Sequence, residues 1–288
     1  MIFKQFSPNN IIIDQMVVTS SGLWRNGQTE WSSFFTSSRQ STKSSSLYSP
    51  LCGLYYLDVY DGSPSESLSD VCFSLAYGNY NGLGSSTYDI STGSLYPTKV
   101  VYTEHSNILL SPGDTKFTFT TSSNFSDHNT IDSDDIYVIN YRNFMEKDGI
   151  VPGKFEMSLV GSDGTITLID DSIDNPSTTL ETNGKRYNLI RGSISSGPIN
   201  SGRCEAIGLI YPNIGIVVLN PTVISRMIGT VGGLSLNDPV TQWSGKFESM
   251  PSILFKAISD GSQLYGKSMK ITVADFVDSR RYIAVAEQ

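Results

Sequence analysis

The sequence lacks any apolar run close to the roughly 18 to 20 residues that a membrane-spanning helix needs, so we expect no membrane partner. Alanine, the best helix former, is also scarce, whereas serine, threonine, tyrosine and isoleucine are plentiful. These residue types suit turns and pleated strands. The chain of 288 residues is long enough to bury a sizeable core. We therefore predict a mainly β fold made of one or two antiparallel, β-sandwich-like domains with a few short helices.

Positive charge is in short supply as well. Lys and Arg together number 20 against 28 Asp and Glu, which gives a net charge of -8. This sign opposes contact with phosphates, and the longest basic grouping is the pair Arg280 and Arg281, so we expect no nucleic-acid partner. Residues 1–20 contain one Lys and no long apolar stretch before a small-residue cleavage site. No export signal is predicted, and we expect folding in a cytoplasm.

Cysteine and histidine are too few and too scattered to indicate a metal site. The three cysteines, Cys52, Cys72 and Cys204, form an odd set without the dense, even spacing of a disulfide framework. Reduced, buried thiols are the default interpretation, with a disulfide between Cys52 and Cys72 as the less favoured alternative. Together with His105 and His128, the cysteines show no zinc-ligand spacing. We expect no zinc and no cofactor.

Two groups of carboxylates are the remaining candidates for cation binding. Hard cations such as calcium need six to eight oxygen ligands, and neither group carries the glycine and terminal glutamate of a helix-loop-helix calcium loop. Solvated turns are the preferred interpretation, and calcium stays a secondary hypothesis. The two groups are Asp132, Asp134 and Asp135, and Asp170, Asp171 and Asp174.

No motif for catalysis stands out. The glycine-rich stretch 78–84 has neither the Lys-Ser/Thr of a phosphate-binding loop nor a long helix pattern after it, and it predicts a loop. A G-x-S-x-G elbow is missing from the sequence. Nothing singles out a pair of carboxylates for glycoside hydrolysis. We therefore predict a protein that is not an enzyme and name no catalytic residue; a hydrolase of cell wall or surface polysaccharide is the disfavoured alternative.

Alternating and β-branched runs predict the strands of a core domain over residues 51–230. A helix is predicted over 222–227, opened by Pro221 and closed by Gly229, and the stretch 99–120 is expected to hold strands and one short helix. Residues 231–288 are predicted to form a C-terminal β extension with strands at 253–258, 269–276 and 282–285. Whether the core is one sandwich or two lobes divided near 127–133 stays open. The predicted core strands are 54–60 with 71–77, 116–120, 136–141, 154–160 with 165–169, 187–191, and 207–211 with 214–219.

The N-terminal segment, residues 1–50, is predicted to be an extended arm or a long irregular loop. Its part from Thr19 to Pro50 is rich in Ser and Thr and has no sustained period of 2 or 3.6. Aromatic side chains at intervals can dock into grooves on a neighbouring subunit, or they can cover the domain's own core. The first possibility makes four residues candidate interface anchors: Trp24, Trp31, Phe34 and Phe35.

The order of several segments resembles a known family. Residues 1 to about 225 resemble virion structural proteins of contractile-tailed bacteriophages, especially those of the cyanophage-like myoviruses. The segments that carry the resemblance are KQFSPNNIIID, FFTSS at 34–38, YYLDVY, CFSLAYGNYNGLGS, PTKVVYTEHSNILL, DDIYVINYRN, PGKFEMSLVGSDGTITLIDDS, GKRYNLIRGS and GLIYPNIGIVVLNP.

The resemblance implies a non-enzymatic virion component, assembled in the cytoplasm of the infected bacterium and bound to other virion proteins. We expect a homo-oligomer in the tail or baseplate, joined through subunit contacts. A capsid decoration or neck protein is the main alternative. A carbohydrate-binding receptor module is a second one, because the 15 Tyr and 3 Trp offer flat rings that can stack on sugars.

Overall fold

The computed structural model describes residues 27–31, 35–36, 56–60, 71–84, 96–120, 129–141, 150–172, 180–181, 184–199, 205–237, 246–259 and 269–273. Most of these residues are in strands, and twelve of the strands join one antiparallel sheet. The predicted mainly β, antiparallel class with a few short helices is therefore confirmed.

The strands of this large sheet come from the whole length of the described chain. They are β1 (Gly27–Trp31), β2 (Phe35–Thr36), β3 (Leu57–Tyr60), β4 (Val71–Asn79), β7 (Asp135–Asn140), β8 (Ile150–Gly161), β9 (Gly164–Asp170), β12 (Tyr187–Ser193), β13 (Gly197–Pro198), β14 (Gly208–Tyr211), β15 (Ile216–Leu219) and β18 (Met269–Val273).

Three two-stranded ribbons and three helices complete the described part of the fold. The ribbons are β5 (Phe117–Thr120) with β6 (Thr130–Ser133), β10 (Leu180–Glu181) with β11 (Gly184–Lys185), and β16 (Thr230–Val231) with β17 (Leu234–Ser235). The helices are α1 (Pro97–Leu109), α2 (Pro221–Ile228) and α3 (Lys246–Ser259).

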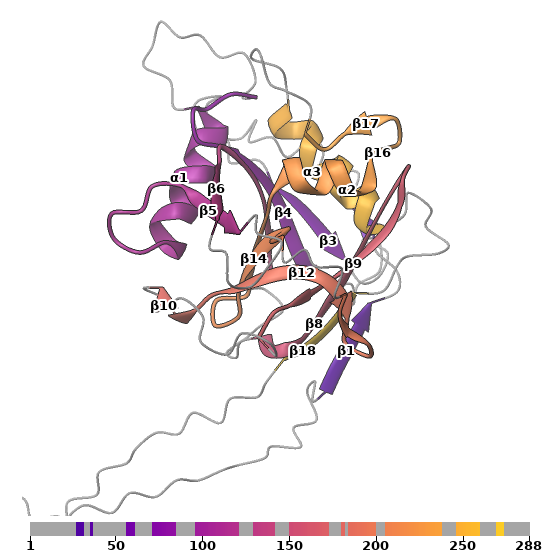
Figure 1. The fold of residues 1–288 in the computed structure, drawn as a ribbon. Helices are drawn as coiled ribbons and strands as arrows, with labels where there is room; N and C mark the ends of the chain where they lie inside the picture. The colour runs from indigo at the N-terminus through magenta and orange to yellow at the C-terminus, as the bar shows by residue number, and fades with distance from the viewer. Residues whose placement is uncertain are drawn as a thin grey trace, which may run out of the picture.

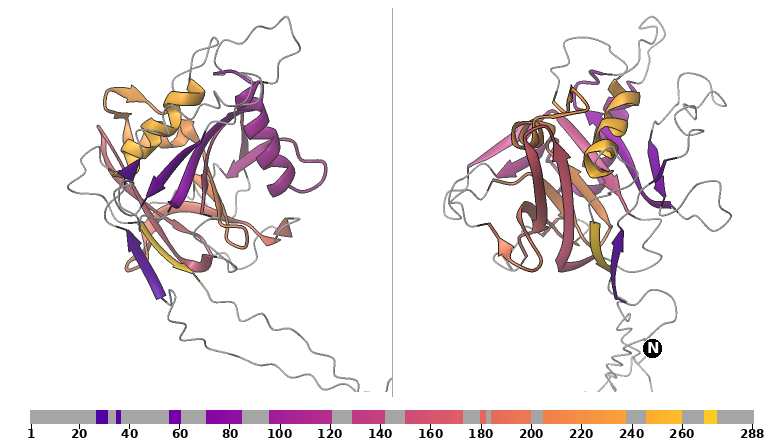
Figure 2. Two further views of the ribbon diagram at one scale, coloured as in Figure 1. Left: turned by 180° about the vertical axis from the view of Figure 1, so that it is seen from behind. Right: turned by 90° about the vertical axis from the view of Figure 1, so that its right-hand side faces the viewer.

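The large sheet curls strongly, as Figures 1 and 2 show. Its strand order is β1-β18-β8-β9-β12-β14-β15-β7-β4-β3-β2, with β13 paired to β12 off this path. The end strands β1 and β2 are separated by only three residues in the chain. Because a residue spans at most about 3.6 Å, Trp31 and Phe35 lie within roughly 14 Å of each other. The two ends of the sheet are therefore brought close together.

The curled sheet has one hydrophobic core on each of its two faces. We call the core on the side of α2 and α3 the inner core, and the core on the side of α1 and the β5–β6 ribbon the outer core. In β15, Val217 and Leu219 pack into the inner core, whereas Ile216 and Val218 pack into the outer one. Successive side chains point to opposite faces, so burial on both sides requires the continuous apolar run seen in this strand. Helices α2 and α3 pack on the inner core, and α1 with the β5–β6 ribbon covers the outer one.

Helix α2 forms where the sequence predicts it. Asn220 caps its N-terminus, because the side-chain oxygen accepts hydrogen bonds from the backbone N–H groups of Thr222 at 3.0 Å and Val223 at 3.4 Å. Pro221 occupies the first turn, where its missing N–H is tolerated. Gly229 follows the helix with a φ of 73°, a left-handed conformation that favours glycine.

Two local predictions are wrong. Residues 253–258, predicted as a strand, belong to helix α3. Its buried residues Met250, Ile253, Leu254, Ala257 and Ile258 recur every three or four positions and face the inner core. The β-branched content of the short run concealed this helical period.

The second error lies in residues 99–109, which belong to one continuous helix, α1, and not to the expected mixture of strands and a short helix. The predicted strand at 282–285 lies outside the described residues. Strands β1 and β2, from the first 50 residues, and β18, from the last 58, pair into the same sheet as the predicted core.

Candidate binding pocket beside helix α1

A cavity of about 300 Å³ lies against the outer face of the sheet, beside helix α1. Strands β4 and β7 supply its floor, which includes Ser74, Ala76, Val138 and Asn140. Helix α1 and the segment at the start of β3 supply the remaining lining residues. The pocket therefore combines three strands with one helix and is formed only when the sheet and the helix have packed together.

Strand register places polar groups in one row across the floor. Asp58 of β3 lies opposite Ser74 of β4, and Ser74 lies opposite Asn140 of β7. The Ser74 hydroxyl donates a hydrogen bond of 2.6 Å to the Asp58 carboxylate. In the adjacent row, Ala76 lies opposite Val138 and supplies an apolar surface. The floor is thus polar along one row and apolar along the next.

Helix α1 presents Val101, Glu104 and His105 to the pocket. These residues stand at positions i, i+3 and i+4, which share one face of a helix. Gly78 of β4 permits the close approach of this helix, because a Cβ atom at residue 78 would lie 2.9 Å from the backbone nitrogen of Tyr102. Because Gly78 has no side chain, α1 can pack close to β4, one of the strands that form the pocket floor.

The imidazole ring of His105 is neutral, with one nitrogen that donates a hydrogen bond and one that can accept a hydrogen bond. Its Nδ1 lies 2.8 Å from the carbonyl oxygen of Val101, and because a carbonyl only accepts, Nδ1 carries the hydrogen. Burial lowers the pKa of the His105 ring below its usual value, and this outweighs the opposite effects of the Val101 carbonyl and of Glu104. In the neutral ring Nε2 keeps its lone pair, so it can accept a hydrogen bond from a ligand.

The pocket is rich in acceptors and negative in charge. Asp58 and Glu104 contribute carboxylates, and none of the described lining residues is Lys or Arg. Tyr56 adds an aromatic side chain that is 52% exposed. This set of groups can bind a donor-rich molecule with an apolar face, because carboxylate oxygens accept hydrogen bonds and the ring offers a flat surface.

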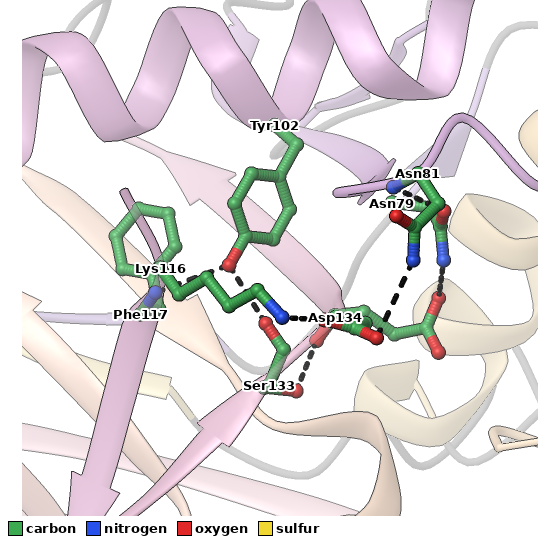
Figure 3. A network of polar contacts seen from close by, with 8 residues as sticks. Asn79, Asn81, Tyr102, Lys116, Phe117, Ser133 and Asp134 are labelled. Carbon is green, nitrogen blue, oxygen red and sulfur yellow. Dashed lines mark hydrogen bonds and ion pairs between the residues drawn. The ribbon is translucent and has the colours of Figure 1, made fainter. Parts of the chain in front are cut away.

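A hydrogen-bond network on the other side of α1 fixes this helix in place (Figure 3). The Tyr102 hydroxyl donates to the carbonyl oxygen of Ser133 at 2.7 Å and accepts from the backbone N–H of Phe117 at 3.1 Å. One phenol group thereby joins α1 to both strands of the β5–β6 ribbon. Burial raises the pKa of Tyr102 to about 12, although the hydrogen bond from Phe117 acts in the opposite direction.

An ion pair extends the network toward the end of β4. The Lys116 ammonium lies 2.7 Å from the Asp134 carboxylate and 4.5 Å from the centre of the Tyr80 ring. The hydrogen bond to Asp134 raises the pKa of Lys116. The side-chain oxygen of Asn79 accepts hydrogen bonds from the backbone N–H groups of Asn81 and Leu83, which closes the turn after β4. The network thus links the ribbon to the strand that carries the pocket floor.

The predicted interface residues are only partly within the described structure. Trp31 is the last residue of β1 and pairs with Met269 of β18, and Phe35 begins β2 and pairs with Tyr60 of β3. Trp24 and Phe34 lie outside the described residues. The structure therefore places one predicted anchor on each end strand of the sheet.

The first acidic group is engaged in protein contacts. Asp134 pairs with Lys116, and the Asp135 carboxylate accepts hydrogen bonds from Tyr77 at 2.5 Å and from Asn79 at 2.7 Å. These contacts join the strands that surround the carboxylates. In the described ranges there is no group of three or more His, Cys, Asp or Glu side chains placed to hold a metal ion.

The second acidic group is buried at the end of β9. Asp170 accepts a hydrogen bond of 2.7 Å from the backbone N–H of Gly153. Asp171 accepts two hydrogen bonds from Asn188, one from its backbone and one from its side chain. Burial raises the pKa of Asp171, in opposition to these bonds. The solvated turn preferred for this group is therefore wrong for Asp170 and Asp171, which are 2% and 1% exposed, while Asp174 lies outside the described residues.

Sequence reasoning did not single out the pocket. The alternation in residues 55–60 could have placed Tyr56 and Asp58 on the same face of a strand. It could not have shown that Glu104 and His105 stand beside them, because that depends on how α1 packs. Cys72, expected as a buried thiol, is 2% exposed in the inner core, whereas Cys52 and Cys204 lie outside the described residues.

The chain matches no family model, and searches of curated proteins and of solved structures return no match either. The resemblance to phage virion proteins accordingly stays a prediction. Among the helices of the described residues, none has the length and apolar character needed to cross a membrane.

Proposed function

We propose that this chain is a non-enzymatic structural component of the virion of a contractile-tailed bacteriophage, associated with the tail or baseplate. It is assembled in the cytoplasm of the infected bacterium and contacts other virion proteins and further copies of itself. The resemblance of residues 1 to about 225 supports the choice of family. The arrangement of the sheet ends supports action through subunit contacts.

The observation that carries this mode of action is the position of β1 and β2. Both strands come from the N-terminal segment, and each stands at one end of the strand order. Among the described strands, β1 pairs only with β18 and β2 pairs only with β3. An end strand presents backbone N–H and C=O groups that can pair with a strand of a neighbouring subunit. Trp31 and Phe35 stand on these two strands as candidate apolar anchors.

A reconstruction of the intact particle tests the proposal. We expect density for this chain in the tail or baseplate, with a neighbouring subunit against β1 or β2. Density on the capsid or neck would favour the alternative of a decoration or neck protein. Purified particles in which mass spectrometry detects no peptide of this chain would contradict the virion role.

A further inference from the structure

We propose that the outer edge of strand β6, the edge that faces away from β5, pairs with the same edge of a second copy of this chain. The pairing is antiparallel, about a two-fold axis at Ile131. This contact is separate from the end strands β1 and β2 of the large sheet, because β6 belongs to the two-stranded β5–β6 ribbon. The inference rests only on this ribbon and does not depend on the proposed virion role.

The hydrogen bonds of the ribbon show which backbone groups of β6 point outward. Thr120 lies opposite Thr130, but its carbonyl oxygen accepts a hydrogen bond of 2.8 Å from the backbone N–H of Ala206, so this carbonyl points away from β6. Hydrogen-bonded and non-hydrogen-bonded pairs alternate along an antiparallel ladder, so Thr130 belongs to a non-hydrogen-bonded pair. The same alternation places Asp132, opposite Thr118, in a non-hydrogen-bonded pair. The N–H and C=O groups of Thr130 and Asp132 therefore point away from β5.

The outer edge of β6 is accessible in the described structure. Among the described strands, β6 pairs only with β5. Thr130, Ile131 and Asp132 are all exposed, and the exposed fraction of Ile131 is 52%. Ile131 lies opposite Phe119, a fully buried residue of the outer core, so the two side chains are on the same face of the ribbon. An apolar side chain at the margin of the outer core thus lies beside outward-pointing backbone groups, which favours strand addition.

The spacing of these groups fits a second copy of the same strand. In a two-fold antiparallel pair centred on Ile131, Thr130 of each copy lies opposite Asp132 of the other. Both residues direct their N–H and C=O groups outward, so the two pairs together make four backbone hydrogen bonds. Each pair also combines a hydroxyl donor with a carboxylate acceptor. Between them, Ile131 lies opposite Ile131 of the second copy in a non-hydrogen-bonded pair, where the side chains are closest.

Other symmetric registers fit less well. An axis midway between Thr130 and Ile131 would set outward-pointing backbone groups against the groups of Ile131, which by the same alternation point toward β5. An axis at Asp132 would place Ile131 opposite Ser133, which is buried. An axis at Thr130 would place the apolar Ile131 opposite the polar Asn129. The axis at Ile131 is therefore the register that uses the exposed residues of β6 on both copies.

The contact is small, so we expect weak and reversible self-association. Stable interfaces bury about 1,200 Å² or more, whereas one pair of short edges covers far less. The pairing joins two ribbons into a four-stranded sheet, and a two-stranded ribbon is only marginally stable by itself. Each copy carries a net charge of -8, so the measurements belong at physiological ionic strength, where the repulsion between copies is screened.

Disulfide crosslinking of the full-length chain tests the pairing. In I131C the two introduced thiols face each other across the axis at a Cα separation of about 4.5 Å, which a disulfide can span. Under mild oxidation we expect about fivefold more disulfide dimer than in I199C, a variant at a residue that is 50% exposed outside the ribbon. Wild type gives the background from the native cysteines, and peptide mapping identifies the bridged position. A yield from I131C no higher than from I199C would overturn the proposal.

A mixture of T130C and D132C tests the position of the axis. These two positions face each other between copies, so the mixture should form a disulfide dimer that joins one variant to the other. In either variant alone, the two introduced thiols lie diagonally across the axis at a Cα separation of roughly 8 Å, beyond the reach of a disulfide. Crosslinking of T130C alone or of D132C alone that equals the mixture would overturn the assigned axis.

Sedimentation equilibrium over a range of protein concentrations measures the association without a covalent bond. I131K places two like charges opposite each other at the axis and should weaken dimerisation about tenfold, whereas I199K should leave it close to wild type. A thermal melt checks that each variant is folded. Equal dimerisation of I131K and wild type would assign self-association to another surface and overturn the proposal. A wild type that stays monomeric at every concentration would also overturn it, whatever the outcome for the virion role.

Discussion

At the scale of single residues, Tyr102 connects three separate elements through one hydroxyl group. Its hydroxyl bonds to the backbone of β5 and of β6, while its ring packs in the outer core on α1. The Phe117 ring stacks on it in a T-shaped arrangement with centroids 5.5 Å apart. The position of the helix that forms the pocket wall therefore depends on the side chain of Tyr102.

Replacement of Tyr102 by Phe should lower the free energy of unfolding by about 1–3 kcal/mol. The change keeps the ring but leaves the buried N–H of Phe117 without its acceptor and the carbonyl of Ser133 without this donor. Urea denaturation of the two proteins measures the difference. Y56F, which removes the hydroxyl of a half-exposed tyrosine, is the control and should change stability little. Equal stability of Y102F and wild type would show that the network does not hold the helix.

The same residue predicts an alkaline dependence of stability. The pKa of Tyr102 is raised to about 12 in the folded chain, compared with 10.0 for an unperturbed tyrosine. Below pH 10 both states keep the proton, and the stabilisation by Tyr102 is fully present. Between pH 10 and 12 the unfolded chain releases the proton while the folded chain retains it, so stability falls as pH rises.

Urea midpoints at pH 8, 10, 11 and 12 test this sign. The stability advantage of wild type over Y102F should shrink above pH 10, because Phe has no proton to lose. A difference that stays constant over this range would contradict the raised pKa. Other buried tyrosines change both proteins alike and cancel in the comparison.

At the level of secondary-structure elements, two residues determine where helices α1 and α2 lie on the sheet. Asn220 begins α2 directly after β15, and its cap fixes where the chain turns from strand to helix. Gly78 lets α1 approach β4, where Tyr102 lies against the strand. The two helices cover opposite faces of the curled sheet, so each feature controls one of the two cores.

Replacement of Asn220 by Ala should cost about 0.5–2 kcal/mol of stability. The change removes the acceptor for the N–H groups of Thr222 and Val223 at the start of α2. Chemical denaturation followed by circular dichroism measures the loss. T222A is the matched control, because the Thr222 side chain is exposed in the same helical turn. An effect of N220A no larger than that of T222A would rule out capping as the role of Asn220.

Replacement of Gly78 by Ala should destabilise the fold by about 1–3 kcal/mol. The new methyl group would lie 2.9 Å from the Tyr102 backbone nitrogen and 3.2 Å from Ile136 Cγ1, so helix or strand must move. The thermal midpoint and the near-ultraviolet circular dichroism of the packed tyrosines report this change. K99A, on an exposed position of α1, should leave both signals close to wild type. An unchanged midpoint in G78A would mean that α1 has room to shift.

Helix α2 and the β8–β9 hairpin were predicted correctly from local sequence patterns, whereas α3 was not. The alternation Phe155, Met157, Leu159 before the turn at 161–164 predicted the β8–β9 hairpin, and the structure pairs Gly161 with Gly164 in it. The Pro221 and Gly229 signals correctly bounded α2. In α3, by contrast, the short run Ile253 to Ile258 contains β-branched residues that suit either structure. Only packing against the inner core selects the helix there.

At the scale of the whole molecule, the curled sheet brings the first and last parts of the described chain together. Strands β1 and β18 pair along five residues each, so the N-terminal segment is attached to the core through a strand from the C-terminal region. The end strands β1 and β2 then lie where a neighbouring subunit could add to the sheet. We therefore expect the N-terminal segment to join the sheet through its backbone pairing and to contact a neighbouring subunit through its aromatic side chains.

Simultaneous replacement of Trp31 and Phe34 by Ala should reduce incorporation of the chain into phage particles several-fold, while the isolated protein stays folded. The reason is the loss of two candidate aromatic anchors, Trp31 at the end of β1 and Phe34, which precedes β2 in the sequence, because a few aromatic residues often contribute most of the binding energy of an interface. Quantitative mass spectrometry of purified particles measures incorporation, and a thermal melt checks the fold. I199A, at a residue that is 50% exposed elsewhere, serves as the control. Full incorporation of the double variant would remove the anchor hypothesis.

Local sequence patterns are enough to predict the β class, the central hairpins and α2, because these depend on alternation, turn residues and capping within a few positions of each other. The curl of the sheet, the helical state of residues 253–258 and the pocket depend instead on packing between distant segments. Asp58 and His105 are 47 positions apart in the chain yet line one cavity, because α1 packs on the outer face of β4. Packing of this kind buries both faces of the sheet at the same time, and no short sequence pattern indicates which distant segments will cover them.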